Sequence, residues 1–243
     1  MQMVQAVSRF GALFADWVFP ATCAACNSGI ERGAAFCEAC RESLTPLPPS
    51  CSRCAQPTGS FAVTCRRCRI HPLPLDSIVA PWLYGGELAT AIKRLKFNSD
   101  IAVARDLAPM WAPALAIAIG VHELDVIVPI PLHWRRRWQR GFDQNTILLQ
   151  HAMRVAQLKT PVAFALRRHR HTPEQSRLPA AARQSNLVGA FDVPPRFQSA
   201  IAGKRVVLLD DVVTTGATMA AAARTLRRAG ATRIVGVCVA RAE

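Results

Sequence analysis

Apolar residues gather along this chain in short runs, and the segments between these runs have a helical pattern. Five runs rich in Val, Ile and Leu have the length of buried strands rather than of helices. Between them, ELATAIKRLKF places Leu88, Ile92 and Leu95 on one helix face, and AAAARTLRRAG has strong helix propensity up to Gly230. Strands that alternate with helices predict an α/β fold with a doubly wound parallel sheet. The five runs lie at 77–84, 125–130, 162–168, 206–209 and 232–241.

Two further segments are expected to be helices whose extent is set by proline. Residues 4–18 have an amphipathic pattern that ends at Pro20, and residues 100–119 form a second helical stretch. The second helix is expected to be interrupted near Pro109 and Pro113, because proline lacks the backbone N–H and its ring clashes with the preceding turn.

Cysteine and proline divide the chain into three predicted parts. Eight of the nine cysteines lie within residues 23–68, and a stiff, extended His-Pro-Leu-Pro connector follows at 71–74. The predicted parts are an N-terminal helix at 1–20, a small cysteine-rich module at 21–72 and a larger α/β domain at 73–243.

The eight cysteines form four C-x-x-C pairs, with ten residues between each pair and the next. This spacing indicates two tandem units, in which two C-x-x-C loops place four thiolates tetrahedrally around one Zn²⁺. A disulfide framework would need an oxidising compartment, so we expect two structural zinc ions. Sequential pairing is the simplest arrangement, and crossed pairing stays open. Cys238 lies in an apolar strand pattern and is expected to be an inert core residue. The expected zinc ligands are Cys23, Cys26, Cys37, Cys40, Cys51, Cys54, Cys65 and Cys68.

Residues 206–218, VVLLDDVVTTGAT, join a strand, two aspartates, a turn of small residues and the start of a helix. Backbone N–H groups of a tight turn at a helix N-terminus favour an anion, and threonine hydroxyls add donors. Asp210 and Asp211 only accept hydrogen bonds when ionised, which suits the paired hydroxyls of a ribose. The order of these parts predicts a site for a phosphorylated sugar.

At every position this stretch resembles the signature by which type I phosphoribosyltransferases bind phosphoribosyl pyrophosphate (PRPP). The resemblance implies transfer from PRPP, with Mg²⁺ bridging pyrophosphate and ribose oxygens and with Asp210 and Asp211 as candidate catalytic residues. Purine-type relatives often carry an acidic general base where this chain has Thr214, so the acceptor and the base stay open. The expected PRPP-binding residues are Asp210, Asp211, Val213, Thr214, Thr215, Gly216, Ala217 and Thr218.

The strand at 125–130 runs into PLHWRRRWQRGFDQN, an arginine-rich loop at a position where α/β sheets place ligands. Guanidinium groups bind phosphate oxygens, so the loop is a candidate pyrophosphate site, with a solvated arginine run as the alternative. Trp134 and Trp138 could stack on nucleic-acid bases or anchor the loop by packing. A polar segment at 169–182 suggests a lid over the site. The candidate pyrophosphate residues are Arg135, Arg136, Arg137, Arg140 and Arg168.

The pattern VPIPL…R…RGFDQN resembles the ComF competence-protein family, as do LKF at 95–97, RQSNLVGAF at 183–191 and the cysteine pairs. Asp143 is a departure, since asparagine is usual there. The resemblance implies a zinc-binding N-terminal segment, here a double zinc ribbon. It also implies a type I phosphoribosyltransferase fold with a small hood over the site. Its functional implication is a link to imported single-stranded DNA, with that DNA and competence-machinery proteins such as a helicase as partners.

The net charge of +14 favours polyanionic partners such as nucleic acid or phosphorylated metabolites. Arg9 and Asp16 interrupt the N-terminal apolar run, so no membrane span is expected, and the expected compartment is the cytoplasm. Three functions are compatible with these patterns. They are a PRPP-dependent transferase, a DNA-handling accessory protein and a PRPP-sensing regulator of nucleotide metabolism.

Overall fold

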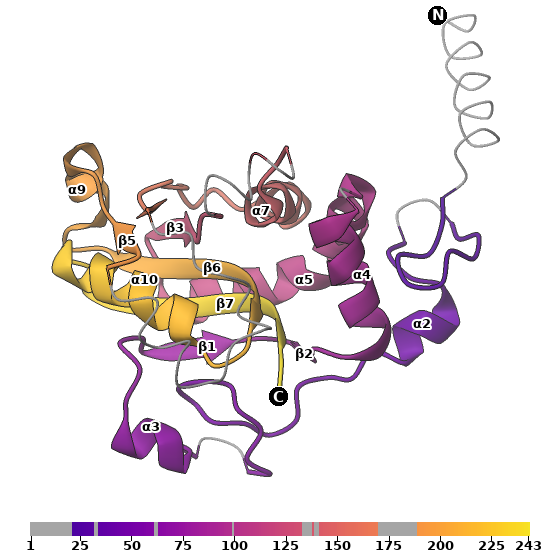
Figure 1. Cartoon of the computed structure of the whole chain (residues 1–243), viewed down its shortest axis with the longest axis horizontal. Coiled ribbons are helices and arrows are strands. Elements are labelled where there is room, and N and C mark those ends of the chain that lie inside the picture. The colour runs from indigo at the N-terminus through magenta and orange to yellow at the C-terminus, as the bar shows by residue number, and fades with distance from the viewer. Residues whose placement is uncertain are drawn as a thin grey trace, which may run out of the picture.

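The computed structural model describes residues 21–31, 34–60, 63–98, 100–132, 138, 141–169 and 189–243 (Figure 1). The helix expected at 4–18 lies outside these residues.

Among the described residues, the main sheet contains five strands: β1 (Ser77–Val79), β2 (Trp82–Leu83), β3 (Val126–Pro129), β6 (Arg205–Val213) and β7 (Arg233–Arg241). Their order is β1-β7-β6-β3, β2 continues the β1 edge along β7, and every pairing is parallel. A parallel bridge between Ile127 and Val162 adds one more contact beyond β3. The predicted parallel sheet is confirmed.

Helices cover both faces of this sheet. On one face lie α4 (Gly86–Phe97), α5 (Ile101–His122) and α7 (Gln144–Val155), and α10 (Ala217–Arg228) covers the other (Figure 1). Side chains alternate between the faces of a strand. Accordingly, Val207 and Leu209 pack toward the three-helix side, whereas Val206 and Leu208 pack toward α10. Because both faces of β6 are covered, its apolar run is continuous rather than alternating.

The expected interruption of the second helix is wrong, since α5 runs without a break through Pro109 and Pro113. Both prolines are exposed, so the carbonyl groups that lose their N–H partners can bond to water instead. The opposite face of α5 is fully buried at Leu107, Trp111 and Leu115. By length and composition α5 could cross a membrane, but its buried face identifies it as a core helix.

The run at 162–168 is not the single strand that its composition predicts. Val162 bridges to β3, and the chain then forms β4 (Arg167–Arg168), which pairs antiparallel with β5 (Phe191–Asp192). This two-stranded unit contacts α10, where the carbonyl oxygen of Phe191 accepts from the Thr225 hydroxyl at 3.3 Å. The small hood over the site stays a prediction.

The two cysteine units pack on opposite faces of the sheet. The first unit, which contains α2 (Glu38–Glu42), shares a core with α4 and α5. Arg94 of α4 binds this unit by donating to the carbonyl oxygen of Cys23 at 3.0 Å and to Asn27 Oδ1 at 2.6 Å. The second unit, which contains α3 (Arg66–Ile70), shares a core with α10 and β1. Figure 1 shows α2 beside α4 and α3 below β1, at separate places on the sheet.

The closest packing around a strand glycine gives the first prediction. A methyl group at Gly236 of β7 would lie 2.9 Å from Met219 Sδ and 3.2 Å from Ile78 Cγ1. Gly236→Ala should therefore lower the free energy of unfolding by about 1–3 kcal/mol in urea denaturation, because the core is overpacked. Gly120→Ala is the control, since nothing lies near that position on α5 and alanine favours the helix. An unchanged stability for Gly236→Ala would contradict this packing.

Candidate functional site

Asp210 and Asp211 lie near the carboxyl end of β6, where parallel α/β sheets bind ligands. Strand alternation turns Asp211 toward the face that α4 and α7 cover. There, Lys96 Nζ lies 2.8 Å from Asp211 Oδ1, and Gln144 Nε2 donates to Oδ2 at 2.9 Å. Asp211 is buried at 5% exposure, and each of its carboxylate oxygens has a partner.

Lys96 is the cation that neutralises this acidic pair. Burial alone would lower the pKa of Lys96, but the negative charges of Asp211 and Asp210 outweigh it and raise the pKa. Lys96 therefore stays protonated at neutral pH. In the sequence Lys96 stands beside Lys93 and Arg94, a grouping that suggests a basic helix face, but its ammonium group points into the site. Lys96 follows the buried Ile92 by four positions, and this spacing could have indicated its inward direction.

Asp210 has a different environment. Its Oδ1 accepts from Asn145 Nδ2 at 3.0 Å and from the backbone N–H of Asp211 at 3.0 Å. Its Oδ2 has no hydrogen-bond partner among the described residues. Burial and the negative charge of Asp211 raise the pKa of Asp210 to about 7, although Asn145 and Lys96 oppose this rise. Asp210 is thus the carboxylate of the pair with an oxygen available for a ligand.

The RGFDQN motif supplies the amides that hold the two carboxylates. Asp143 caps α7 by accepting from the backbone N–H groups of Asn145 and Thr146, at 3.1 and 3.2 Å. The Asn145 side chain also donates to the carbonyl oxygen of Ile130 at 3.0 Å, so it joins the ends of β3 and β6. Sequence reasoning assigned this motif to phosphate through its arginines and missed the role of Gln144 and Asn145.

The turn after β6 presents backbone donors. Gly216 has a φ of 74°, a conformation that glycine adopts without strain, and α10 begins at the next residue. The Thr215 hydroxyl accepts the N–H of Ala217 at 3.3 Å. Within the described part of the chain, the backbone N–H groups of Thr214, Thr215 and Gly216 find no acceptor. Three such donors beside a helix N-terminus can hold a phosphate group.

The eight thiols form two separate four-cysteine groups in sequential pairing, with crossed pairing absent among the described residues. Within each group all Sγ atoms lie within 4.8 Å of one another, and the Cys26–Cys37 and Cys54–Cys65 Sγ distances are both 3.7 Å. Thiolates 2.3 Å from a tetrahedral zinc would be about 3.8 Å apart, so the geometry fits Zn²⁺. Cys238 is fully buried beside Met219, as expected for a core residue.

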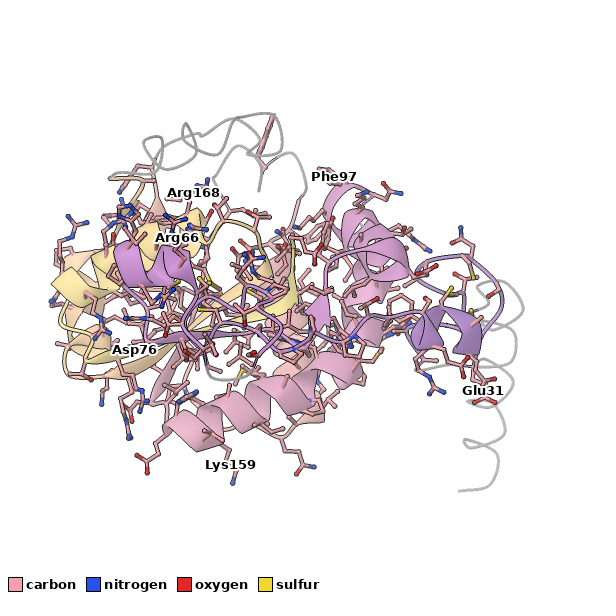
Figure 2. The ribbon with its side chains drawn as sticks, turned by 90° about the horizontal axis from the view of Figure 1, so that it is seen from below. Glu31, Arg66, Asp76, Phe97, Lys159 and Arg168 are labelled. Carbon is pink, nitrogen blue, oxygen red and sulfur yellow. The ribbon has the colours of Figure 1, made fainter. Side chains whose placement is uncertain are left out.

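The predicted pyrophosphate residues are only partly described. Arg135, Arg136, Arg137 and Arg140 lie outside the described residues, as does the suggested lid beyond His169. Arg168 lies on β4 with its guanidinium 5.6 Å from the centre of the Phe191 ring (Figure 2). Trp138 is 85% exposed with respect to the rest of the structure. Phe97 is exposed at the end of α4 (Figure 2).

Comparison with known proteins matches two family models. Residues 14–69 match the double zinc ribbon domain, and residues 149–243 match the phosphoribosyl transferase domain. The DNA utilization protein YhgH of Escherichia coli (strain K12) is 34% identical over 173 residues, which cover 70% of this chain and 74% of that protein. Competence protein F of Haemophilus influenzae is 32% identical over 162 residues, covering 65% and 70%.

Among solved structures, the allosteric regulatory enzyme of purine biosynthesis has 21% sequence identity and a TM-score of 0.37. The match covers 57% of this chain and spans 25% of that chain.

The ion pair between Lys96 and the buried Asp211 gives the second prediction. Lys96→Met should lower the free energy of unfolding by about 3 kcal/mol, because it leaves Asp211 buried without its cation. The double variant Lys96→Met/Asp211→Asn should recover much of this loss, as measured by urea denaturation. Lys93→Met, on the exposed side of the same helix, serves as the control and should change stability by less than about 0.5 kcal/mol. Additive losses in the double variant would argue against the pair.

The raised pKa of Asp210 gives the third prediction. The folded chain binds a proton on Asp210 more tightly than the unfolded chain does, so this group makes folding less favourable as the pH rises from about 4 to about 7. Asp210→Asn removes this penalty. Without ligand, its stability relative to wild type should therefore increase from pH 4 to pH 8, by at most about 4 kcal/mol. Thermal unfolding across this range measures the difference, and a pH-independent difference would refute the raised pKa.

Proposed function

The chain belongs to the ComF family, and on this premise we propose that it binds PRPP with Mg²⁺ and supports natural competence or the use of imported single-stranded DNA. The observation that carries the proposal is the placement of two kinds of group at one edge of the sheet. A carboxylate oxygen of Asp210 and the amides of Thr214, Thr215 and Gly216 follow one another on a single strand and turn. A sugar phosphate needs acceptors for its hydroxyls and donors for its phosphate, in this proximity.

The residues would divide the ligand between them. The turn from Thr214 to Thr218 would bind the 5′-phosphate, and Asp210 Oδ2 would accept a ribose hydroxyl. Asp211, which is bound by Lys96 and Gln144, would add negative charge beside the ligand and hold the carboxyl end of β6 in place. Mg²⁺, when bound with PRPP, would neutralise charge on the pyrophosphate. The predicted pyrophosphate residues remain Arg135, Arg136, Arg137, Arg140 and Arg168.

We propose transfer of the phosphoribosyl group as the activity, to an acceptor that the site does not identify. In that reaction the bond between ribose C1 and pyrophosphate breaks, and a nucleophile forms a new bond to C1. Thr214 cannot remove a proton at neutral pH, so the acceptor must need little activation or must find its base elsewhere. The setting we propose is the cytoplasm, where reduced cysteines are available to bind zinc.

A DNA-handling accessory protein is the second candidate. The exposed Trp138, which lies among arginines in the sequence, and the net charge of +14 favour contact with single strands. In that case PRPP would be a regulatory ligand, and the third possibility, a PRPP sensor in nucleotide metabolism, would share the same binding site.

The fourth prediction concerns PRPP itself. Calorimetry with PRPP and Mg²⁺ should show binding to the wild type, and Asp210→Asn should weaken it by about tenfold or more, because a charged acceptor for the ribose is lost. Glu123→Gln is the control, since Glu123 pairs with Arg205 at the opposite end of β6. Equal affinity of Asp210→Asn and wild type would exclude Asp210 from the site.

The same preparations separate the candidate functions. Pyrophosphate release should be measured against a panel of nucleobases and single-stranded oligonucleotides. Release that depends on one acceptor supports the transferase. Intact PRPP binding without release under any condition contradicts it and favours the accessory or sensing function.

A further inference from the structure

The second cysteine unit contacts the turn that presents the backbone donors. Arg67 lies on α3 between Cys65 and Cys68, and its Nη2 donates to the carbonyl oxygen of Thr215 at 2.6 Å. This contact joins residues that are 148 positions apart in the chain. Leu73, just after the same unit, lies behind Gly216, where an added methyl group would be 3.5 Å from Leu73 Cδ1.

A second contact reaches the turn through Arg241. Its Nη1 donates to the carbonyl oxygens of Val213, at 3.1 Å, and of Thr214. Its Nη2 donates to the side-chain oxygen of Gln56. Gln56 belongs to the second cysteine unit, since its own carbonyl oxygen accepts the N–H of Cys51 at 2.8 Å. Arg241 is only 3% exposed, so its guanidinium is oriented by these partners.

These contacts fix the direction of three successive peptide groups. In a trans peptide the C=O and the N–H point in opposite directions, and the described residues contain no cis peptide bond. The carbonyls of Val213, Thr214 and Thr215 are held by Arg241 and Arg67. The N–H groups of the same three peptides, which belong to Thr214, Thr215 and Gly216, are therefore turned the other way. They are the donors assigned above to the phosphate.

We propose that the second four-cysteine unit holds the phosphate-binding turn in place. Arg67 and Gln56 are positioning residues: Arg67 orients the turn by binding a carbonyl group directly, and Gln56 does so through Arg241. Zinc in that unit then stabilises the binding form of the turn, because it holds the C-x-x-C loop that contains Arg67 and the one that Gln56 follows. The identity of the ligand rests on the proposed function. The positioning role links the second four-cysteine unit to the proposed sugar-phosphate site.

The test compares two fragments of PRPP on the full-length chain. Calorimetry should measure ribose 5-phosphate, whose phosphate is assigned to the turn, and inorganic pyrophosphate, which is assigned to the arginines. Arg67→Ala should weaken ribose 5-phosphate by about tenfold through loss of a charged donor, and leave pyrophosphate unchanged. Arg67→Lys should restore part of the affinity. Arg66→Ala is the matched control, because Arg66 is an exposed arginine on the same helix (Figure 2), and it should bind both fragments like wild type.

Two more variants test whether Gln56 and the bound zinc act on the turn. Gln56→Ala frees the Arg241 guanidinium and should also weaken ribose 5-phosphate selectively while two zinc ions per chain remain. Cys65→Ser should lose one zinc ion per chain, measured by metal analysis, together with the same selective affinity.

The outcomes distinguish this inference from the proposed function. A wild type that binds neither PRPP nor ribose 5-phosphate refutes the proposed function. A wild type that binds them, with Arg67→Ala and Gln56→Ala equal to it, overturns the positioning role alone. Equal losses for both fragments would also overturn it, since they would indicate general destabilisation.

Discussion

Two adjacent carboxylates at the end of a covered strand are tolerated only where cations and amide donors surround them. Asp210 and Asp211 impose this constraint, and the rest of the site meets it. Lys96 comes from α4 and Gln144 and Asn145 come from the first turn of α7, so both helices must dock at the carboxyl end of β6. The result is an asymmetric pair, because Asp211 is fully partnered while Asp210 keeps one oxygen for a ligand.

The two cysteine units support the same site from outside the sheet. Each unit is too small to bury a core of its own, and each packs against a different face of the α/β domain. The first is tied to α4 through Arg94, two residues before Lys96. The second reaches the turn after β6 through Arg67 and Gln56. The double zinc ribbon therefore contacts two elements that form the candidate site, helix α4 and the turn after β6.

Tertiary packing overrode local preference in several places. Pro109 and Pro113 do not interrupt α5, because they face solvent while the opposite side of the helix is buried. The run at 162–168 divides between the main sheet and the β4–β5 pair, although its composition resembles one strand. Lys96 points into the site, although its neighbours Lys93 and Arg94 suggest a basic surface.

The sequence by itself determined the parallel α/β fold, the eight cysteines of the zinc ribbons and the strand–turn–helix that contains Asp210, Asp211 and Gly216. Strand and helix periods, C-x-x-C loops and turn chemistry each act over a few residues, so a linear pattern reveals them. Only the tertiary structure decided which groups meet this turn. Lys96, Gln144, Arg67 and Arg241 come from distant segments, and their partners depend on how helices and cysteine units dock on the sheet. That docking is set by buried contacts between residues far apart in the chain, which no local pattern specifies.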